Sequence, residues 1–412
     1  MPKIDLTPNP RARQPVLGFA SSMQAVRILL TVAVVVGAGF LAFRGLQGPA
    51  KPPEPAFKAP PLPDMGTLGT GGPLIGTVSP VPQDPKSAPP PLEPDPVILG
   101  TPVAADAVID VRVPYRTGTK SRYRVEESQL LTDQDTSAQT WWRMIWGVSA
   151  EVVQGDGTGP ARLRFQVDSF RFHTYTMGQR IDFDSEHPDK TLLDDPALNL
   201  ARTLKPLLAT LAVPVGLVID ASGAVHSVEG AEALTRKFVE EVDKLSAKAA
   251  RVATDAPSPE SVQQKWTEFL FPPLGGGTLR SGEAREIAFR TTFPDLERWG
   301  SLTSGRVRVT HDDPDAFRVE FKGTPVIEEL NRPVRGEAAA TVEKVRIDAS
   351  ADSTVASWRF DRKAGRLLES TLHSRYRIVV GRRAGVDERG QPIYSHPYTW
   401  VERSVRAVLL DK

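Results

Sequence analysis

Cysteine is absent from all 412 residues of the chain. Disulfide bonds, thiolate metal sites and cysteine nucleophiles are therefore excluded. An excess of one charge is also absent, because 51 lysines and arginines are balanced by 50 aspartates and glutamates. Proteins that bind nucleic acids usually carry a basic excess, so we expect no nucleic-acid partner. A chain of this length is too long for one compact core, and its composition divides it into three zones.

The sequence also lacks the motifs of common catalytic sites. It has no nucleophile elbow, no Ser-x-x-Lys and no dinucleotide-binding fingerprint, and the glycines at 275–277 lack the lysine of a phosphate-binding loop. The six histidines are scattered, without the spacing of metal ligands. We therefore name no catalytic residue, no metal site and no cofactor, and expect a protein that is not an enzyme.

The first zone contains an uncharged run of sixteen residues, from Ile28 to Phe43, between Arg27 and Arg44. At about 1.5 Å per residue a helix of this length spans roughly 24 Å, and the flanking arginines can extend outward toward the headgroups. A cleaved signal peptide is the alternative. Its lead is normally short, whereas 27 residues precede this run, and a proline interrupts the small residues that follow. The run predicts a single uncleaved transmembrane helix.

Basic residues flanking this run predict its orientation. Four precede it and three follow it, namely Lys3, Arg11, Arg13 and Arg27, then Arg44, Lys51 and Lys58. The side with more lysine and arginine usually stays in the cytoplasm. We expect residues 1–27 to be a cytoplasmic tail, residues 28–43 to span a bacterial inner membrane, and the remaining chain to be extracytoplasmic.

Residues 45–107 form the second zone, where 17 of the 37 prolines lie between Pro49 and Pro102. Proline has no backbone donor and disfavours helix in the residue before it, so this segment predicts a disordered linker. Its extended stretches give it a reach on the order of 100 Å. The linker would act either as a spacer that holds the body away from the membrane or as an ordinary connection. Both roles predict the same composition, so both stay open.

Residues 108–412 predict a mainly β, α+β body: one or more curved antiparallel sheets covered by a few helices. Apolar residues occupy every second position from Trp142 to Val152, which is typical of a strand with one wet face. The parity of the next strand changes near Asp168 and Ser169, which indicates a β-bulge. A division of the body into two halves, 108–272 and 278–412, and a single undivided domain both fit this order of elements.

Three helices and two tight hairpins are expected within the body. The helices cover residues 195–211, where Pro206 should kink or divide the helix, residues 234–249, and a segment that begins at Ser258 and carries Trp266. The hairpins have an aspartate that starts the turn and a glycine that supplies the positive φ angle, at Asp220 to Gly223 and Asp361 to Gly365. A duplication and two unrelated hairpins explain this similarity equally well.

This organisation, with a membrane segment, two strand-rich halves and a helical middle, resembles uncharacterised extracytoplasmic domains of bacterial envelope proteins. Those domains are in turn similar to the lipoprotein-carrier half-barrel, in which a sheet wraps around helices and holds an acyl chain. The resemblance covers residues 120–410 and rests on organisation and the two hairpins. It implies an acyl-binding fold but assigns no role to any residue of this chain.

Three groups of side chains are candidate functional residues. The first is aromatic and would line a hydrophobic groove if the helices leave it open, or fill the core if they do not: Trp142, Trp146, Phe165, Phe170 and Phe172. The second would contact an anionic surface, or keep an exposed strand from aggregating: Arg375, Arg377, Arg382 and Arg383. The third would chelate a hard cation, or form the polar end of a strand: Asp182, Asp184, Glu186 and His187.

The sequence therefore predicts a membrane-anchored envelope protein whose β-rich module binds a hydrophobic ligand or another envelope component. A lipid and an envelope protein are the expected classes of partner, besides the membrane itself. The alternatives are a structural or assembly subunit of an envelope complex and, less favoured by strand alternation, a hydrolase that uses the acidic group with a metal ion.

Overall fold

The computed structural model describes most of the body of the protein. The described residues are 101–133, 139–157, 160–176, 179–194, 201–245, 257–292, 299–329, 342–386 and 391–410. The predicted cytoplasmic tail, the run from Ile28 to Phe43 and nearly all of the linker lie outside them. Among the described residues, no helix is long and apolar enough to cross a bilayer.

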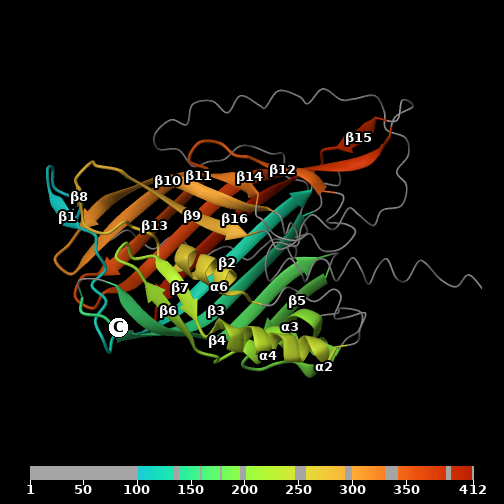
Figure 1. The fold of residues 1–412 in the computed structure, drawn as a ribbon, viewed down its shortest axis with the longest axis horizontal. Coiled ribbons are helices and arrows are strands. Elements are labelled where there is room, and N and C mark those ends of the chain that lie inside the picture. Colours follow the sequence, from blue (N-terminus) through green and yellow to red (C-terminus); the bar gives the residue numbers. More distant parts are fainter. Residues whose placement is uncertain are drawn as a thin grey trace, which may run out of the picture.

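One large antiparallel sheet dominates the body, and it confirms the prediction of a mainly β architecture (Figure 1). Its path runs β7-β6-β4-β3-β2-β16-β14-β13-β11-β10-β9, while β5 pairs with β4, and β12 and β15 pair with β14. The strands are β2 (Lys120–Asp133), β3 (Gln139–Gln154), β4 (Ala161–Thr176), β5 (Gln179–Asp184), β6 (Val215–Ile219), β7 (Val225–Glu229), β9 (Arg285–Thr292), β10 (Trp299–Asp312), β11 (Ala316–Glu329), β12 (Val342–Asp348), β13 (Thr354–Asp361), β14 (Arg366–Val386), β15 (Pro392–Ser395) and β16 (Tyr398–Leu409). A separate short pair joins β1 (Val108–Asp110) to β8 (Thr278–Arg280).

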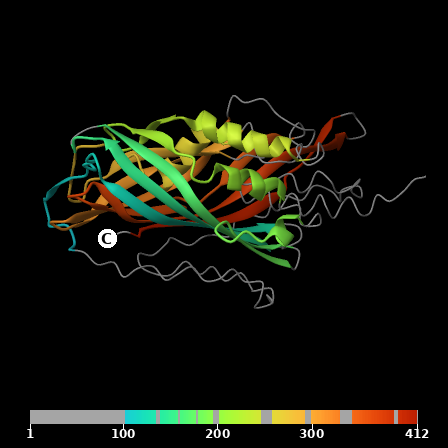
Figure 2. The same ribbon diagram turned by 90° about the horizontal axis from the view of Figure 1, so that it is seen from below.

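The helices lie against one side of the curved sheet, as Figures 1 and 2 show. They are α2 (Lys190–Asp194), α3 (Ala201–Thr210), α4 (Ala231–Asp243) and α6 (Pro259–Phe269). Helices α3 and α4 pack together, whereas α6 contacts both β7 and β9, the two ends of the strand path. Helix α6 therefore fills the gap between the two edges of the sheet.

The local sequence explains where α6 begins and ends. Ser258 accepts a hydrogen bond from the backbone N–H of Ser261, and the Ser261 hydroxyl accepts one from the backbone N–H of Ser258. This reciprocal cap, with Pro259 in the first turn, confirms the predicted start. Helix α3 continues through Pro206, so of the two expected outcomes, a kink or a division, the division does not occur, and the predicted start of this helix at residues 195–200 lies outside the described residues. A proline removes only one helical hydrogen bond, which packing can offset.

The bulge predicted at Asp168 is present. Gly147 pairs with Ser169 and the next residue, Val148, pairs with Val167, so Asp168 is the extra residue of β4. The bulge returns Phe170 to the inner face, where it is buried together with Phe165 on the other side of the irregularity. One inserted residue thus keeps the whole of β4 in register with the core.

Both expected hairpins form, as β6–β7 and β13–β14. The Asp220 carboxylate accepts hydrogen bonds from the backbone N–H groups of Ser222 and Ala224. The Asp361 carboxylate accepts them from the backbone N–H groups of Lys363 and Ala364. Gly223 and Gly365 have the positive φ angles that the turns need.

Strands from both predicted halves, 108–272 and 278–412, belong to the same sheet, because β2 pairs with β16 along eleven consecutive residues. The inner face of this sheet is continuous with the hydrophobic core. Side chains on alternate positions of the long strands point into that core or outward, as the burial patterns of β2, β3 and β16 show.

Two glycines face each other across β10 and β11, where Gly305 pairs with Gly323. A Cβ atom on Gly305 would overlap the carbonyl oxygen of Lys322. We expect Gly305→Ala to lower the free energy of unfolding by about 1–3 kcal/mol, because the sheet must move to accommodate the methyl group. Urea denaturation of the full-length protein measures this change. Arg306→Ala, an exposed neighbour in the same strand, is the control, and an equal effect of both changes would contradict the steric explanation.

Candidate functional site on the inner face of the sheet

All five aromatic residues predicted to bind a ligand point toward the interior, and none is more than 6% exposed. The Trp146 and Phe170 rings lie 5.7 Å apart, and Phe170 is 5.5 Å from Phe183 of β5. Trp142 and Phe172 are buried on the same face, on β3 and β4. The structure therefore gathers these residues into one aromatic wall, and it packs them as core.

Helix α6 supplies the opposite side of this wall. The Trp266 ring lies 4.6 Å from the Phe165 ring and 5.9 Å from the Phe269 ring. The Lys265 ammonium is 3.9 Å from the centroid of the Trp146 ring, which is a favourable cation–π distance. We call the side chains of Trp146, Phe165, Phe170, Trp266 and Phe269 the aromatic cluster.

A buried ion-pair network joins the sheet to α6 beside the aromatic cluster. The Arg403 guanidinium donates hydrogen bonds of 2.8 and 3.0 Å to Glu127 and of 2.6 and 3.0 Å to Glu268. Only 13% of the Arg403 side chain and 6% of the Glu268 side chain are exposed. Lys265 adds a second cation, 3.9 Å from Glu127. The network holds two carboxylates and two cations, so its formal charges balance.

Burial and neighbouring charges shift the pKa values in this region. Burial opposes the charge on Arg403, but the carboxylates of Glu268 and Glu127 outweigh it and raise the pKa of Arg403. Burial lowers the pKa of Lys265, and Glu127 acts in the opposite direction. Burial also raises the pKa of the Tyr376 hydroxyl to about 12, against the influence of Arg403. At neutral pH Arg403 is therefore a fixed cation, and Tyr376 is a neutral donor beside it.

Two buried indole groups of the aromatic wall have no hydrogen-bond partner among the described residues. They are the Nε1 atoms of Trp142 and Trp146, both of which belong to predicted site residues. On α6, the side-chain oxygens of Gln264 and Thr267 are also buried without a partner. An unsatisfied buried polar group costs about 1–3 kcal/mol, so such groups are rare in cores unless a ligand or another group completes them.

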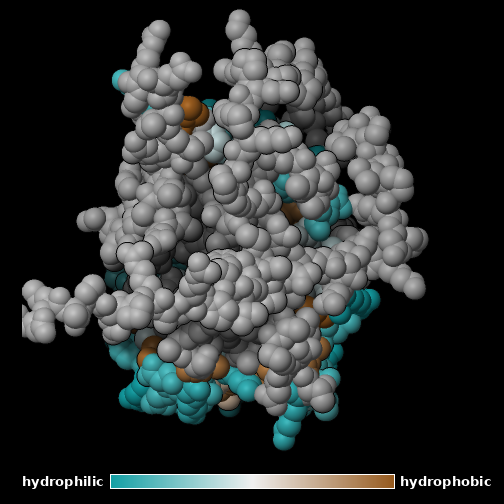
Figure 3. Space-filling view, turned by 90° about the vertical axis from the view of Figure 1, so that its right-hand side faces the viewer, coloured by the Kyte–Doolittle hydropathy of each residue, from teal (hydrophilic) through white to brown (hydrophobic). Residues whose placement is uncertain are grey.

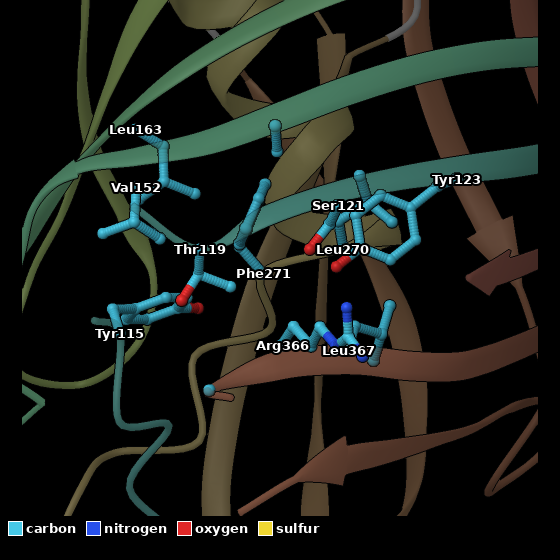
Figure 4. A pocket seen from close by; sticks show the side chains of 12 residues that line it. Tyr115, Thr119, Ser121, Tyr123, Val152, Leu163, Leu270, Phe271, Arg366 and Leu367 are labelled. Carbon is cyan, nitrogen blue, oxygen red and sulfur yellow. The ribbon is translucent and has the colours of Figure 1, made fainter. Parts of the chain in front are cut away.

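A small pocket lies at one end of the aromatic cluster, where β2 and β14 begin and β3 ends (Figure 4). Its volume is about 20 Å³. Apolar side chains of Val152, Leu163, Leu270 and Phe271 form one part of its lining. The other part is polar and consists of Tyr115, Thr119, Ser121, Tyr123 and Arg366.

The predicted cationic residues lie on the outer face or in the extension of β14. Arg375 is 3.2 Å from Glu402, while Arg377 donates to Asp348 at 2.5 Å. For Arg382 and Arg383 only the backbone is described, paired with β15 at Ser395 and Tyr394. Up to Arg382, strand β14 has neighbours on both sides, so protection of an edge strand does not explain the charges of Arg375, Arg377 and Arg382.

Trp400 lies on the outer face beside these arginines and is 37% exposed. The guanidinium carbons of Arg375 and Arg377 are 5.7 and 5.9 Å from the centroid of its ring. Seen from the end of the molecule, the described residues that are visible are mostly hydrophilic, with scattered hydrophobic side chains (Figure 3). On the outer face, Trp400 therefore lies between two arginines.

The acidic group on and after β5 is divided between different cations. Asp182 lies 2.7 Å from His173 and 2.8 Å from Arg180, whereas Asp184 and Glu186 lie 3.0 and 3.2 Å from Arg171. His187 is 3.9 Å from Asp184 and is largely exposed. Burial would raise the pKa of Asp182, but His173 and Arg180 hold it below its usual value. The described residues contain no group of three potential ligands arranged to hold a metal ion.

Sequence reasoning missed the residues of the ion-pair network and the polar side of the pocket. A signal was present in β2, because Glu127 occupies an inward position between Val125 and Gln129 of an alternating strand. Arg403 likewise occupies an inward position, on β16. A charged residue in phase with the apolar side of a strand usually needs a buried partner. The partner Glu268, however, is on a distant helix, and nothing in the local pattern identifies it.

No protein-family model matches this chain, and no curated protein matches it. DynF from the dynemicin biosynthesis pathway of Micromonospora chersina is 7% identical, over 76% of this chain and 92% of that chain, with a TM-score of 0.16. Pseudomonas aeruginosa OccK2 (OpdF), in complex with glucuronate, is 8% identical over 72% of this chain and 100% of that chain, with a TM-score of 0.17. A BenF-like porin from Pseudomonas fluorescens is 7% identical over 71% of this chain and 100% of that chain, with a TM-score of 0.16. At such low scores these similarities carry no argument about fold or function.

The ion-pair network makes a prediction about stability. We expect Arg403→Met to lower the free energy of unfolding by about 3–5 kcal/mol, because it leaves Glu127 and Glu268 buried beside each other without their shared cation. Urea denaturation measures this loss. Adding Glu268→Gln to Arg403→Met should recover most of it, since the remaining carboxylate, Glu127, still has Lys265 as its partner.

Arg375→Met is the matched control for that experiment. Arg375 pairs with Glu402 on the outer face, where both side chains are about 40% exposed, and its loss should cost less than about 1 kcal/mol. Similar losses from Arg403→Met and Arg375→Met, or no recovery in the Arg403→Met, Glu268→Gln double variant, would show that the network is not what stabilises the interior.

Proposed function

We propose that this chain is a non-enzymatic envelope protein whose β-rich module binds a hydrophobic ligand in its interior. The uncharged run from Ile28 to Phe43 would hold it in a bacterial inner membrane, with residues 1–27 in the cytoplasm and the module outside. The proline-rich linker would give the module room to move above the bilayer. The resemblance to acyl-binding envelope domains accords with this role.

The observation that carries the proposal is the pair of buried indole N–H groups, on Trp142 and Trp146, without an acceptor. They belong to an aromatic wall, which is a good surface for an acyl chain but a poor one for an isolated donor. An amphiphile with an ester, amide or acid oxygen would supply apolar contact and an acceptor together. Binding would then relieve a cost that the unliganded core carries.

The aromatic residues are packed in this structure, so a ligand must displace neighbouring side chains or move a covering element. Each buried methylene contributes about 0.8 kcal/mol, and ten methylenes therefore contribute about 8 kcal/mol before association costs. This energy is comparable to the cost of disturbing a small part of the core, because removing one large core side chain lowers stability by about 2–5 kcal/mol.

Native mass spectrometry of the full-length chain, extracted with a mild detergent, tests the proposal. We expect a population whose mass exceeds that of the chain by one lipid or fatty acid, and this adduct should diminish in Trp142→Phe, which removes one indole N–H and keeps an apolar ring. Trp400→Phe, on the outer face, is the matched control. A chain that carries no apolar molecule after extraction would contradict the proposal.

A second candidate, an assembly subunit that binds another envelope component, is favoured by Trp400 and its two flanking arginines. A protein partner would bury the exposed ring, and an anionic headgroup would pair with Arg375 and with the cations of β14. The same mass spectra would then show a stoichiometric protein or anionic lipid that is lost in Trp400→Ala. Val355→Ala, another exposed apolar residue of the outer face, should leave that complex intact.

A further inference from the structure

The pocket at the end of the aromatic cluster has two chemically different sides (Figure 4). Leu163 lies two residues before Phe165 on the inner face of β4, and Leu270 follows Trp266 by one helical turn. The apolar side of the pocket is therefore continuous with the aromatic cluster. On the other side the hydroxyls of Ser121 and Tyr123 lie near the Arg366 guanidinium. Such a lining suits a molecule with an apolar chain and a polar head.

Arg366 is the cation of this pocket, and its Nε atom is buried without a hydrogen-bond partner. Its nearest acid is Asp361, whose Oδ2 atom is 3.6 Å away, which is beyond hydrogen-bond distance. The Asp361 carboxylate already accepts two backbone hydrogen bonds, of 2.8 and 2.9 Å, in the β13–β14 turn. Arg366 therefore forms an ion pair with Asp361 that is too long for a hydrogen bond, and its planar guanidinium, with an unsatisfied Nε donor, matches a carboxylate.

Residues 111–119, which we call the strap, cover the pocket. Tyr115 is buried and its ring forms part of the lining. The strap passes so close to the β13–β14 turn that a Cβ on Gly365 would overlap the carbonyl oxygen of Pro114. Seven backbone hydrogen bonds involve the strap and five of them link it to other segments, among them Gly157 N–H to Tyr115 O at 2.9 Å and Thr117 N–H to Gly155 O at 3.0 Å, so its backbone is held in place.

We propose that the pocket binds the acid head of a single-chain amphiphile, a fatty acid, through Arg366, Ser121 and Tyr123, and that the Tyr115 ring of the strap is its lid. The chain of the ligand follows Leu163 and Leu270 into the aromatic cluster. A volume of about 20 Å³ holds little more than one water molecule, so the Tyr115 ring must swing out before the ligand enters. This inference rests on the proposed function, to which it adds the class of ligand and the place of its head.

Photo-crosslinking of the full-length chain in lipid nanodiscs tests the head-group assignment. The probes are a sixteen-carbon fatty acid with a diazirine in its chain and the alcohol of the same chain. Mass spectrometry compares labelling of the peptide that carries Leu270 and Phe271 with labelling of residues 28–43, which serve as the internal reference for probe dissolved in the bilayer. We expect this ratio to be about tenfold higher for the acid, because only the carboxylate forms charge-assisted hydrogen bonds with Arg366.

Arg366→Gln should reduce the ratio for the acid to that for the alcohol and leave the alcohol unchanged. Arg375→Gln removes the same charge from the outer face and should alter neither. If Arg366→Gln does not fold, the comparison of acid with alcohol in the unaltered chain still decides the question. Equal labelling by the two probes would overturn the head-group assignment, whereas absence of labelling at the pocket by either probe would overturn the proposed function itself.

The lid is tested with the same acid probe and short light pulses. Tyr115→Ala should label the pocket several times faster than the unaltered chain, because the ring that closes it is gone. Tyr115→Phe keeps the ring and should label at the original rate. Equal rates in all three proteins would show that the Tyr115 ring does not control access.

Discussion

Helix α6 lies between the two edges of a sheet that does not close on itself, and Arg403 holds it there. An edge strand exposes unpaired backbone groups, which can pair with other chains unless they are covered. Gln263 of α6 donates to the carbonyl oxygens of Val225 and His226 in β7, at 2.7 and 3.2 Å. Glu268, five residues later, pairs with Arg403 on the inner face of β16. The curvature of the sheet and its interior both depend on this helix.

The two faces of the sheet use charge in opposite ways. On the outer face, pairs such as Arg375 with Glu402 are exposed to water and contribute little to stability. On the inner face, Arg403 and its two carboxylates are removed from water, so each charge is tolerable only while the others are present. The buried charges therefore fix the position of α6 against the sheet, whereas charged residues on the outer face can be replaced at little cost in stability.

Much of the fold could be predicted because it follows from short stretches of sequence. Alternation places Trp142 to Val152 on a strand, a break in parity places the bulge at Asp168, and Ser258 with Pro259 starts a helix. The position of α6 and the ion-pair network could not be predicted in this way. Arg403 is 276 residues from Glu127 and 135 from Glu268, and no periodic pattern relates positions so far apart. The pocket was missed for the same reason, since Tyr115, Leu270 and Arg366 come from three separate segments.

The start of the described chain, at Thr101, and the pocket lie at the same end of the sheet, and this placement connects the two proposals. The described chain begins with Thr101, whose N–H donates to Asp313, and near its other end Leu410 donates to Arg122. Between Thr101 and the strap, the longest ladder is the three-residue pairing of β1 with β8. A force transmitted along the linker would therefore act first on the β1–β8 pairing, next on the strap, and only then on the long strands. If the run from Ile28 to Phe43 is anchored in lipid, the strap that carries the lid follows β1 directly along the chain from the anchor, and the position of the module above the bilayer would bear on access to the pocket.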